Sequence, residues 1–167
     1  NFVKRSLLGL VAGEHHILLR GHPGTGKSMF ATRVSSIMPP MAEATHLTAL
    51  RIHGAARSRL AEGLLRGEPP VRAPHHAASA AALLGAEGRP GELALAHGGV
   101  LFLDELPEFR RDLLESLREP LEEGVFQLAR AKQRTSWPAQ FILVAAYNPC
   151  PCGWYGSAHR QCLCGHG

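Results

Sequence analysis

Residues 21–28 have the residue types and the spacing that bind a nucleotide phosphate. They read Gly-His-Pro-Gly-Thr-Gly-Lys-Ser, which matches G-x-x-x-x-G-K-[ST]. Glycines let backbone N–H groups turn toward a β-phosphate, the Lys27 ammonium reaches the β- and γ-phosphates, and the Ser28 hydroxyl ligates Mg²⁺. A strand-like run before the segment and a helical pattern after it favour a P-loop over an ordinary glycine turn. We predict that ATP is bound by nine consecutive residues: Gly21, His22, Pro23, Gly24, Thr25, Gly26, Lys27, Ser28 and Met29.

Two acidic residues follow the apolar run at residues 100–103. The run reads Val-Leu-Phe-Leu, which is typical of a buried strand, and Asp104 and Glu105 come directly after it. Open α/β sheets bind their ligands at this end of a strand. We expect Asp104 to hold Mg²⁺ together with Ser28, and Glu105 to polarise the water that attacks the γ-phosphate. The alternative is a solvated strand end without a role, but the P-loop favours the catalytic interpretation.

A third apolar run, at residues 141–146, leads to Asn148. Asparagine at a strand end is commonly only a turn former. Because the carboxyl ends of parallel strands meet at one edge of a sheet, we expect Asn148 to lie between the two phosphate motifs and to help position the attacking water. The predicted catalytic residues are therefore Lys27, Glu105 and Asn148.

The elements that must hold these residues alternate between strand and helix. Apolar runs predict three buried strands, at residues 17–19, 100–103 and 141–146. Helical spacing occurs at residues 2–11, 29–38, 43–53, 76–84 and 107–124, and a β-hairpin pattern occurs at residues 125–128 and 135–138. These patterns predict an α/β fold in three layers around a parallel sheet, the fold of P-loop NTPases. A length of 167 residues fits one domain.

All four cysteines lie close together near the end of the chain, in the order Cys-Pro-Cys-Gly and then Cys-Leu-Cys-Gly. Their absence elsewhere argues against a framework of disulfides and favours a reducing compartment. Four thiolates can form a tetrahedral Zn²⁺ site, although C-x-C pairs are tighter than the usual C-x-x-C. Reduced free thiols in a surface loop are the alternative. The candidate zinc ligands are Cys150, Cys152, Cys162 and Cys164, with His159 and His166 as substitutes.

Composition narrows the class of protein. Hydrophobic residues make up 45% of the chain, and 18 basic against 14 acidic residues leave a net charge of +4. This mild excess permits nucleotide or nucleic-acid partners without requiring them. The longest apolar runs are far shorter than the roughly 20 residues that cross a bilayer, and the opening residues fit a helix better than a signal peptide. We therefore expect a soluble, cytoplasmic protein with no membrane partner.

Five longer strings carry a family resemblance. They are Arg-Ala-Pro-His-His at residues 72–76, Pro-Gly-Glu-Leu-Ala-Leu-Ala-His at 90–97, Gly-Val-Leu-Phe-Leu-Asp-Glu-Leu-Pro-Glu-Phe at 99–109, Leu-Arg-Glu-Pro-Leu-Glu at 117–122 and Asn-Pro-Cys-Pro-Cys-Gly at 148–153. They closely resemble the magnesium-chelatase-like AAA+ ATPases of the YifB/ComM type, over nearly the whole chain. One departure is Ala77, where the family pattern usually has Thr after the paired histidines.

The resemblance implies further features of the fold and assembly. A helix-2 insertion would lie at residues 54–97, and a hairpin before the sensor strand at residues 125–139. Residues 1–167 would be a single AAA+ ATPase core, without the family's lid domain, N-terminal domain and candidate arginine finger. We expect copies to form a ring, a hexamer in the full-length protein, and the core alone to hydrolyse ATP poorly.

The resemblance also implies work on DNA, as an ATP-driven helicase for branch migration during natural transformation. Its alternatives are a chelatase-type motor that inserts metal into a tetrapyrrole, against which the Cys-Pro-Cys-Gly run argues, and a module that only binds nucleotide. Three cations at the predicted hairpin tip can each meet a phosphate, although any exposed turn can carry such charge. The predicted DNA contacts are Arg130, Lys132 and Arg134.

Histidines outside the P-loop give weaker signals. His75, His76 and His97 are candidates to line a pore or the edge of the nucleotide site. The others are most simply surface or core residues: His15, His16, His46 and His53.

Overall fold

A parallel four-stranded sheet forms the centre of the molecule, in the strand order β1-β8-β5-β2. The computed structural model describes residues 9–57, 61–86, 88–130 and 133–164. All three pairings within this sheet are parallel, so the carboxyl ends of its strands share one edge. Its members are β1 (Ile17–Arg20), β2 (Val71–Arg72), β5 (Val100–Leu103) and β8 (Ile142–Tyr147).

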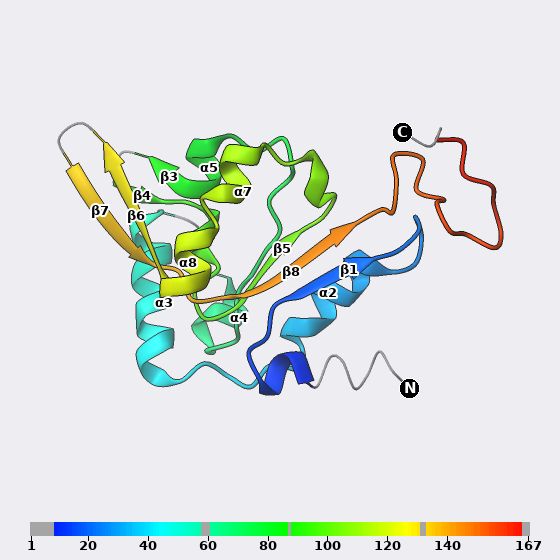
Figure 1. Cartoon of the computed structure of the whole chain (residues 1–167). Helices are drawn as coiled ribbons and strands as arrows, with labels where there is room; N and C mark the ends of the chain where they lie inside the picture. Colours follow the sequence, from blue (N-terminus) through cyan, green and yellow to red (C-terminus); the bar gives the residue numbers. More distant parts are fainter. Residues whose placement is uncertain (1–8, 58–60, 87, 131–132, 165–167) are drawn as a thin grey trace.

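Helices cover both faces of the sheet, and Figure 1 shows α2 on one side and α5 and α7 on the other. The helices are α2 (Lys27–Ser35), α3 (Glu43–Ala55), α4 (Glu62–Leu65), α5 (Ala80–Leu84), α6 (Glu92–Leu95), α7 (Arg111–Glu115) and α8 (Arg118–Glu123), with a 3-10 turn η1 (Leu106–Glu108). Residues 9–12 are helical, and the rest of the helix predicted at residues 2–11 lies outside the described residues.

Alternation along β5 explains the three layers. Val100 and Phe102 belong to the core cluster that contains Val34 of α2, whereas Leu101 and Leu103 belong to the cluster under the helices of the opposite face. Successive strand side chains point to opposite faces, so a strand buried on both sides must be apolar at every position. The apolar run at residues 100–103 therefore predicted this central strand correctly.

The single helix predicted at residues 107–124 is wrong, because this stretch forms η1, α7 and α8 in succession. Phe109 and Arg110 have extended backbone angles, and the Phe109 side chain is buried in the core. The first turn of a helix can accommodate Pro120, but in a continuous helix the proline ring would clash with the carbonyl of Ser116. The chain therefore ends α7 at Glu115 and begins α8 at Arg118.

Residues 54–97, where the family resemblance implies a helix-2 insertion, contain several regular elements. They contain the end of α3, then α4, α5 and α6, and β2, which pairs with β5 at the edge of the main sheet. A small antiparallel pair lies between α5 and α6, formed by β3 (Gly85–Ala86) and β4 (Arg89–Pro90).

The antiparallel hairpin of β6 (Val125–Arg130) and β7 (Gln133–Pro138) projects away from the sheet, at the left of Figure 1. Its base is fixed by Trp137, which packs against the cluster of Ile52, Ala94 and Leu95. Arg130 and Arg134 lie in the paired strands, where the structure describes their backbone pairing, and Lys132 lies outside the described residues. Across the described part of the chain, no helix has the length and apolar character needed to span a membrane.

Candidate nucleotide-binding site

The predicted P-loop connects β1 to α2 at the carboxyl edge of the sheet. It leaves the strand after Arg20, and α2 begins at Lys27, so the helix N-terminus faces the loop. Gly24 and Gly26 have φ angles of 77° and 83°, in the left-handed region that glycine adopts without steric cost. The loop backbone therefore has the turn that the glycine spacing predicts.

Lys27 reaches across the loop to the neighbouring strand. Its Nζ donates hydrogen bonds to the carbonyl oxygens of Gly21 at 2.9 Å and His22 at 3.0 Å, and to Oδ1 of Asn148 at 3.0 Å. The parallel register of β1 and β8 pairs Arg20 with Tyr147, which places Asn148 directly beside the loop. The sequence prediction that Lys27 and Asn148 share one site therefore agrees with the geometry.

Ser28 and Asp104 meet at the mouth of the same site. The Ser28 hydroxyl donates to Oδ2 of Asp104 at 2.8 Å. A hydroxyl and a carboxylate are the hard oxygen donors that Mg²⁺ prefers, so this donor set, with Ser28 exposed and Asp104 half-buried, fits Mg²⁺. A cavity of about 380 Å³ joins the two motifs and is lined by residues 23–29, Asp104, Glu105 and Asn148.

Glu105 has an unusual backbone and a partner that the sequence did not reveal. Its φ of 52° lies in the left-handed region, and its N–H donates to Oδ1 of Asp104 at 3.0 Å. His76 Nδ1 lies 3.0 Å from Oε2 of Glu105. The ring of His76 also makes an edge contact with Phe109. Two separate constraints therefore orient the carboxylate that we predicted to polarise water.

Of the three histidines predicted to line a pore or the nucleotide edge, His97 is placed elsewhere. Only 5% of it is exposed, and its Nδ1 accepts a hydrogen bond from the backbone N–H of Gln140 at 3.2 Å. Burial lowers the pKa of His97 below its ordinary value. His97 is a core residue near the amino end of β5. His53 is also buried, and its Nε2 contacts the Leu95 carbonyl oxygen, as the core interpretation requires.

The segment that follows β8 packs against the P-loop. The Nδ1–H of His22 donates to the Gly153 carbonyl at 2.8 Å, and the His22 ring stacks on Trp154 with centroids 5.7 Å apart. The Arg160 guanidinium lies over the same Trp154 ring, 5.1 Å from its centre. No local sequence signal predicts these contacts, because the two segments are about 130 residues apart.

Four sulfur atoms converge within this segment. The Sγ atoms of the four cysteines all lie within 4.8 Å of one another, and among the described residues this group contains no histidine. The backbone N–H of Tyr155 donates to Cys150 Sγ at 3.2 Å, and that of Cys152 donates to Cys164 Sγ at 3.3 Å. Hydrogen bonds from the Trp154 and Leu163 backbone lower the pKa of the Cys152 thiol to about 6. His166 lies outside the described residues.

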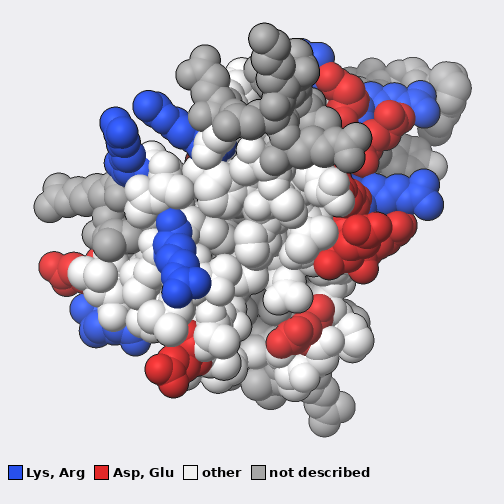
Figure 2. All heavy atoms as spheres, turned by 90° about the vertical axis from the view of Figure 1, so that its left-hand side faces the viewer, with Lys and Arg blue, Asp and Glu red and all other residues white. Residues whose placement is uncertain are grey.

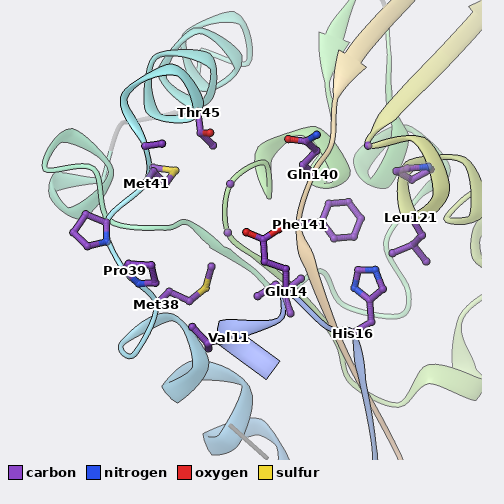
Figure 3. Close-up of a pocket in the computed structure, with 17 residues that line it drawn as sticks. Val11, Glu14, His16, Met38, Pro39, Met41, Thr45, Leu121, Gln140 and Phe141 are labelled. Atoms are coloured by element: carbon purple, nitrogen blue, oxygen red, sulfur yellow. The ribbon is translucent and has the colours of Figure 1, made fainter. Parts of the chain in front are cut away.

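A second cavity, of about 570 Å³, opens at the amino edge of the sheet. Figure 3 shows Glu14 near its centre, between Met38 and Met41 on one side and Phe141 and His16 on the other. Burial lowers the pKa of His16, whose Nδ1 accepts from the Leu143 N–H at 3.0 Å. This cavity is larger than the P-loop cavity, but it lies at the strand ends that point away from the P-loop.

Comparison with known proteins places these motifs in a family. The model of the family "Magnesium chelatase, subunit ChlI" matches residues 2–167. The chain belongs to this family. Within this magnesium chelatase-like family it is 45% identical over 161 residues to "Uncharacterized protein YifB" of Salmonella typhimurium, covering 95% of this chain and 32% of the relative. It is 43% identical over 160 residues to "Competence protein ComM" of Haemophilus influenzae, covering 95% and 31%.

The YifB/ComM resemblance drawn from the five sequence strings is therefore confirmed, and it places the chain in an AAA+ motor family. The chain spans about a third of the length of these curated relatives.

A solved structure supports the fold independently. The structure of NtrX from Brucella abortus in complex with ADP superposes with a TM-score of 0.60 at 18% identity, covering 96% of this chain and 32% of that chain. At this identity the similarity concerns the fold alone. It confirms the predicted α/β fold of AAA+ P-loop NTPases, with a parallel sheet and helices on both faces.

Proposed function

We propose that this chain is the ATP-binding and ATP-hydrolysing core of a ring-forming motor that acts on DNA, as a branch-migration helicase in natural transformation. The observation that carries the ATPase part is the convergence of Lys27, Ser28, Asp104, Glu105 and Asn148 on one cavity. These residues follow three adjacent strands, β1, β5 and β8, and supply a cation, two oxygen donors, a carboxylate and an amide. This is the set of groups that phosphoryl transfer to water requires.

The loop and its lysine bind the phosphates. Backbone N–H groups at the start of α2 and the positive end of its dipole attract the β-phosphate. Bound phosphate oxygens would take the place of the Gly21 and His22 carbonyls as partners of Lys27 Nζ. Ser28 and Asp104 would hold Mg²⁺. When bound, this ion would neutralise negative charge on the phosphate oxygens.

Glu105 and Asn148 act on the attacking water. Both residues line the cavity, each just after the end of one of two neighbouring strands, β5 and β8. The Glu105 carboxylate accepts a proton from the water, and Asn148 fixes its position with an amide hydrogen bond. His76 holds Oε2 of Glu105 at 3.0 Å and acts as a positioning residue for this carboxylate.

The DNA part of the proposal rests on the hairpin and on the name of one relative. The strands β6 and β7 project from the body, and we propose that the turn between them enters the channel of a ring. Figure 2 views the face that carries it, where basic and acidic side chains surround a broad uncharged area. We propose Arg130, Lys132 and Arg134 of this hairpin as the DNA contacts. The relative from Haemophilus influenzae is called "Competence protein ComM".

A chelatase-type motor is the second candidate, because the family description names a magnesium chelatase subunit. The two candidates share the ATPase site and differ in what stimulates it. The decisive experiment measures ATP hydrolysis by the longest natural chain that contains these residues, alone, with branched DNA and with a tetrapyrrole plus Mg²⁺. Stimulation by DNA supports the proposal, and stimulation by tetrapyrrole alone would replace it with the second candidate. ATP binding without hydrolysis under every condition would reduce the chain to a nucleotide-binding module.

A further inference from the structure

We infer that Cys150, Cys152, Cys162 and Cys164 bind one Zn²⁺ ion in a closed tetrahedral site, and that this site holds the P-loop in place through Gly153 and Trp154. This metal site is separate from the Mg²⁺ site of Ser28 and Asp104. The role of the zinc in nucleotide binding rests on the P-loop being the nucleotide site.

The spacing of the sulfur atoms matches a single ion. A Zn–S bond of about 2.3 Å and tetrahedral angles place ligand sulfurs about 3.8 Å apart. Cys150 Sγ lies 3.4 Å from Cys152 Sγ and 3.7 Å from Cys162 Sγ, and the latter two are 3.6 Å apart. A disulfide requires about 2.05 Å, so none of these pairs is bonded. A cluster of several irons would hold its thiolates farther apart, because metal and sulfide atoms lie between them.

The donors suit zinc chemically. Thiolates are soft ligands, and four of them in tetrahedral arrangement select zinc or iron among the common metals. Binding forms four S–Zn bonds, and the protons of the four thiols pass to the solvent. The N–H groups of Tyr155 and Cys152 already point at two of the sulfurs, and such donors stabilise negative sulfur. All four side chains are half-buried, which leaves a path for the ion.

The segment has little else to hold it together. Residues 148–164 contain no helix or strand. Within this stretch the side chains are exposed or half-buried, with Gly153 the buried residue, and Leu163 is 80% exposed. Hydrophobic burial is therefore too small to fix the loop, and a metal crosslink is the usual means by which a short segment without a core is ordered.

The geometry connects this crosslink to the P-loop at one residue. Gly153 follows the ligand Cys152 directly and accepts the hydrogen bond of His22 Nδ1–H. A Cβ at Gly153 would lie 2.7 Å from the Pro23 ring, and its φ of 79° requires glycine. Trp154, the next residue, stacks on His22. Two residues before the first ligand, Asn148 accepts a hydrogen bond from Lys27. The segment after β8 therefore contacts the P-loop at two places, at His22 and Pro23 and at Lys27.

Metal content tests the site itself. The wild-type chain, purified under reducing conditions without chelator or acid, is expected to contain about one Zn²⁺ by elemental analysis. The Cys150→Ser/Cys162→Ser double variant should contain less than about a tenth of that. His159→Ala, in the same segment but outside the sulfur group, is the matched control and should keep the metal. Wild-type protein with four titratable thiols and no metal, or with iron in place of zinc, would overturn the zinc assignment.

Trp154 fluorescence tests the coupling without nucleotide. In a Trp137→Phe background Trp154 is the remaining tryptophan of the chain. Among the described atoms the Trp137 indole N–H has no hydrogen-bond partner, so this change removes no hydrogen bond. Removing zinc with a chelator that does not bind Mg²⁺ should change the Trp154 emission, and restoring zinc should reverse it. His22→Ala should give the changed emission even with zinc bound. If the Trp154 emission changed neither on zinc removal nor in the His22→Ala variant, the coupling between the zinc site and the P-loop would be overturned.

Nucleotide affinity then tests its consequence. In excess Mg²⁺, zinc removal should weaken ATP binding by at least about threefold in calorimetry, with recovery on adding zinc. The His22→Ala variant should keep its zinc and show no further loss on zinc removal. Equal ATP affinity of zinc-loaded and zinc-free wild type would overturn the coupling. A failure of all ATP binding would instead contradict the proposed ATPase function, while the metal content and the Trp154 emission would still report on the site.

Discussion

The two edges of the central sheet are built from the same strands but carry opposite kinds of cavity. The carboxyl edge has the smaller one, about 380 Å³, lined by glycines, a lysine, a serine, an amide and two carboxylates. The amino edge has the larger one, about 570 Å³, in which Met38, Pro39 and Phe141 surround Glu14. Cavity size therefore does not identify the site. The direction of the strands does, because a helix that follows a parallel strand begins at the carboxyl edge and directs its N–H groups there.

Glu105→Gln should give the largest effect at the carboxyl edge. It keeps the size of the side chain and removes the proton acceptor, so kcat for ATP hydrolysis should fall by roughly 10²–10⁴ while ATP affinity is retained. Steady-state kinetics and calorimetry on the longest natural chain measure the two effects. Glu14→Gln, in the amino-edge cavity, is the matched control and should leave both unchanged. A Glu105→Gln variant that retains full turnover would contradict the role of this carboxylate.

The β6–β7 hairpin is a third region, which lies apart from both edges of the sheet. Replacing Arg130, Lys132 and Arg134 by Ala should lower DNA affinity at least about tenfold and flatten the slope of log affinity against log salt by about two to three units. ATP binding should persist, because the hairpin lies away from the P-loop (Figure 1).

The control for the hairpin is a second set of three arginines that already pair with acids on the same chain: Arg110 with Asp112, Arg111 with Glu115 and Arg118 with Glu122. Replacing these three by Ala removes the same number of cations and should affect the salt slope less. If the two triple variants behaved alike in a salt series of fluorescence-anisotropy titrations, net charge and not the hairpin would explain DNA binding.

Lys27→Ala should weaken ATP binding by at least about tenfold, or about 1.4 kcal/mol, because the variant loses the ammonium that faces the β- and γ-phosphates. Isothermal calorimetry gives the affinity directly. His16→Ala, at the amino edge, should bind ATP as the wild type does. Equal affinity of the Lys27→Ala variant and wild type would show that the loop is not the phosphate site.

The smallest expected effect is a pH dependence that originates near the amino edge. Burial lowers the pKa of His97 in the folded protein, so between its ordinary value near 6.5 and its folded value the unfolded chain binds more protons. Stability is therefore fully present above about pH 6.5 and falls as the pH drops through that value. Tm should be lower at pH 5.5 than at pH 7.5, and His97→Gln should reduce the difference. A Tm difference that is the same in His97→Gln would assign the pH dependence to other groups.

Several features of this protein follow from the sequence by itself. The P-loop, the strand at residues 100–103 and its two acids are local patterns, because their conformations depend on neighbouring residues: glycines for positive φ, and apolar side chains for a strand buried on both faces. The hairpin is predicted by the same kind of local signal, and its two strands extend to Arg130 and from Gln133. The family resemblance likewise rests on short stretches of sequence.

Tertiary structure alone decided how these pieces meet. The order β1-β8-β5-β2 brings Asn148 to Lys27 and His76 to Glu105, and strand order depends on packing between residues far apart in the chain. The break of the helix predicted at residues 107–124 accompanies the burial of Phe109 in the core, in addition to the local effect of Pro120. Four cysteines in two pairs leave free thiols and a metal site equally open in the sequence. The fold of the segment after β8 brings the sulfurs within 4.8 Å of one another and places Gly153 against Pro23.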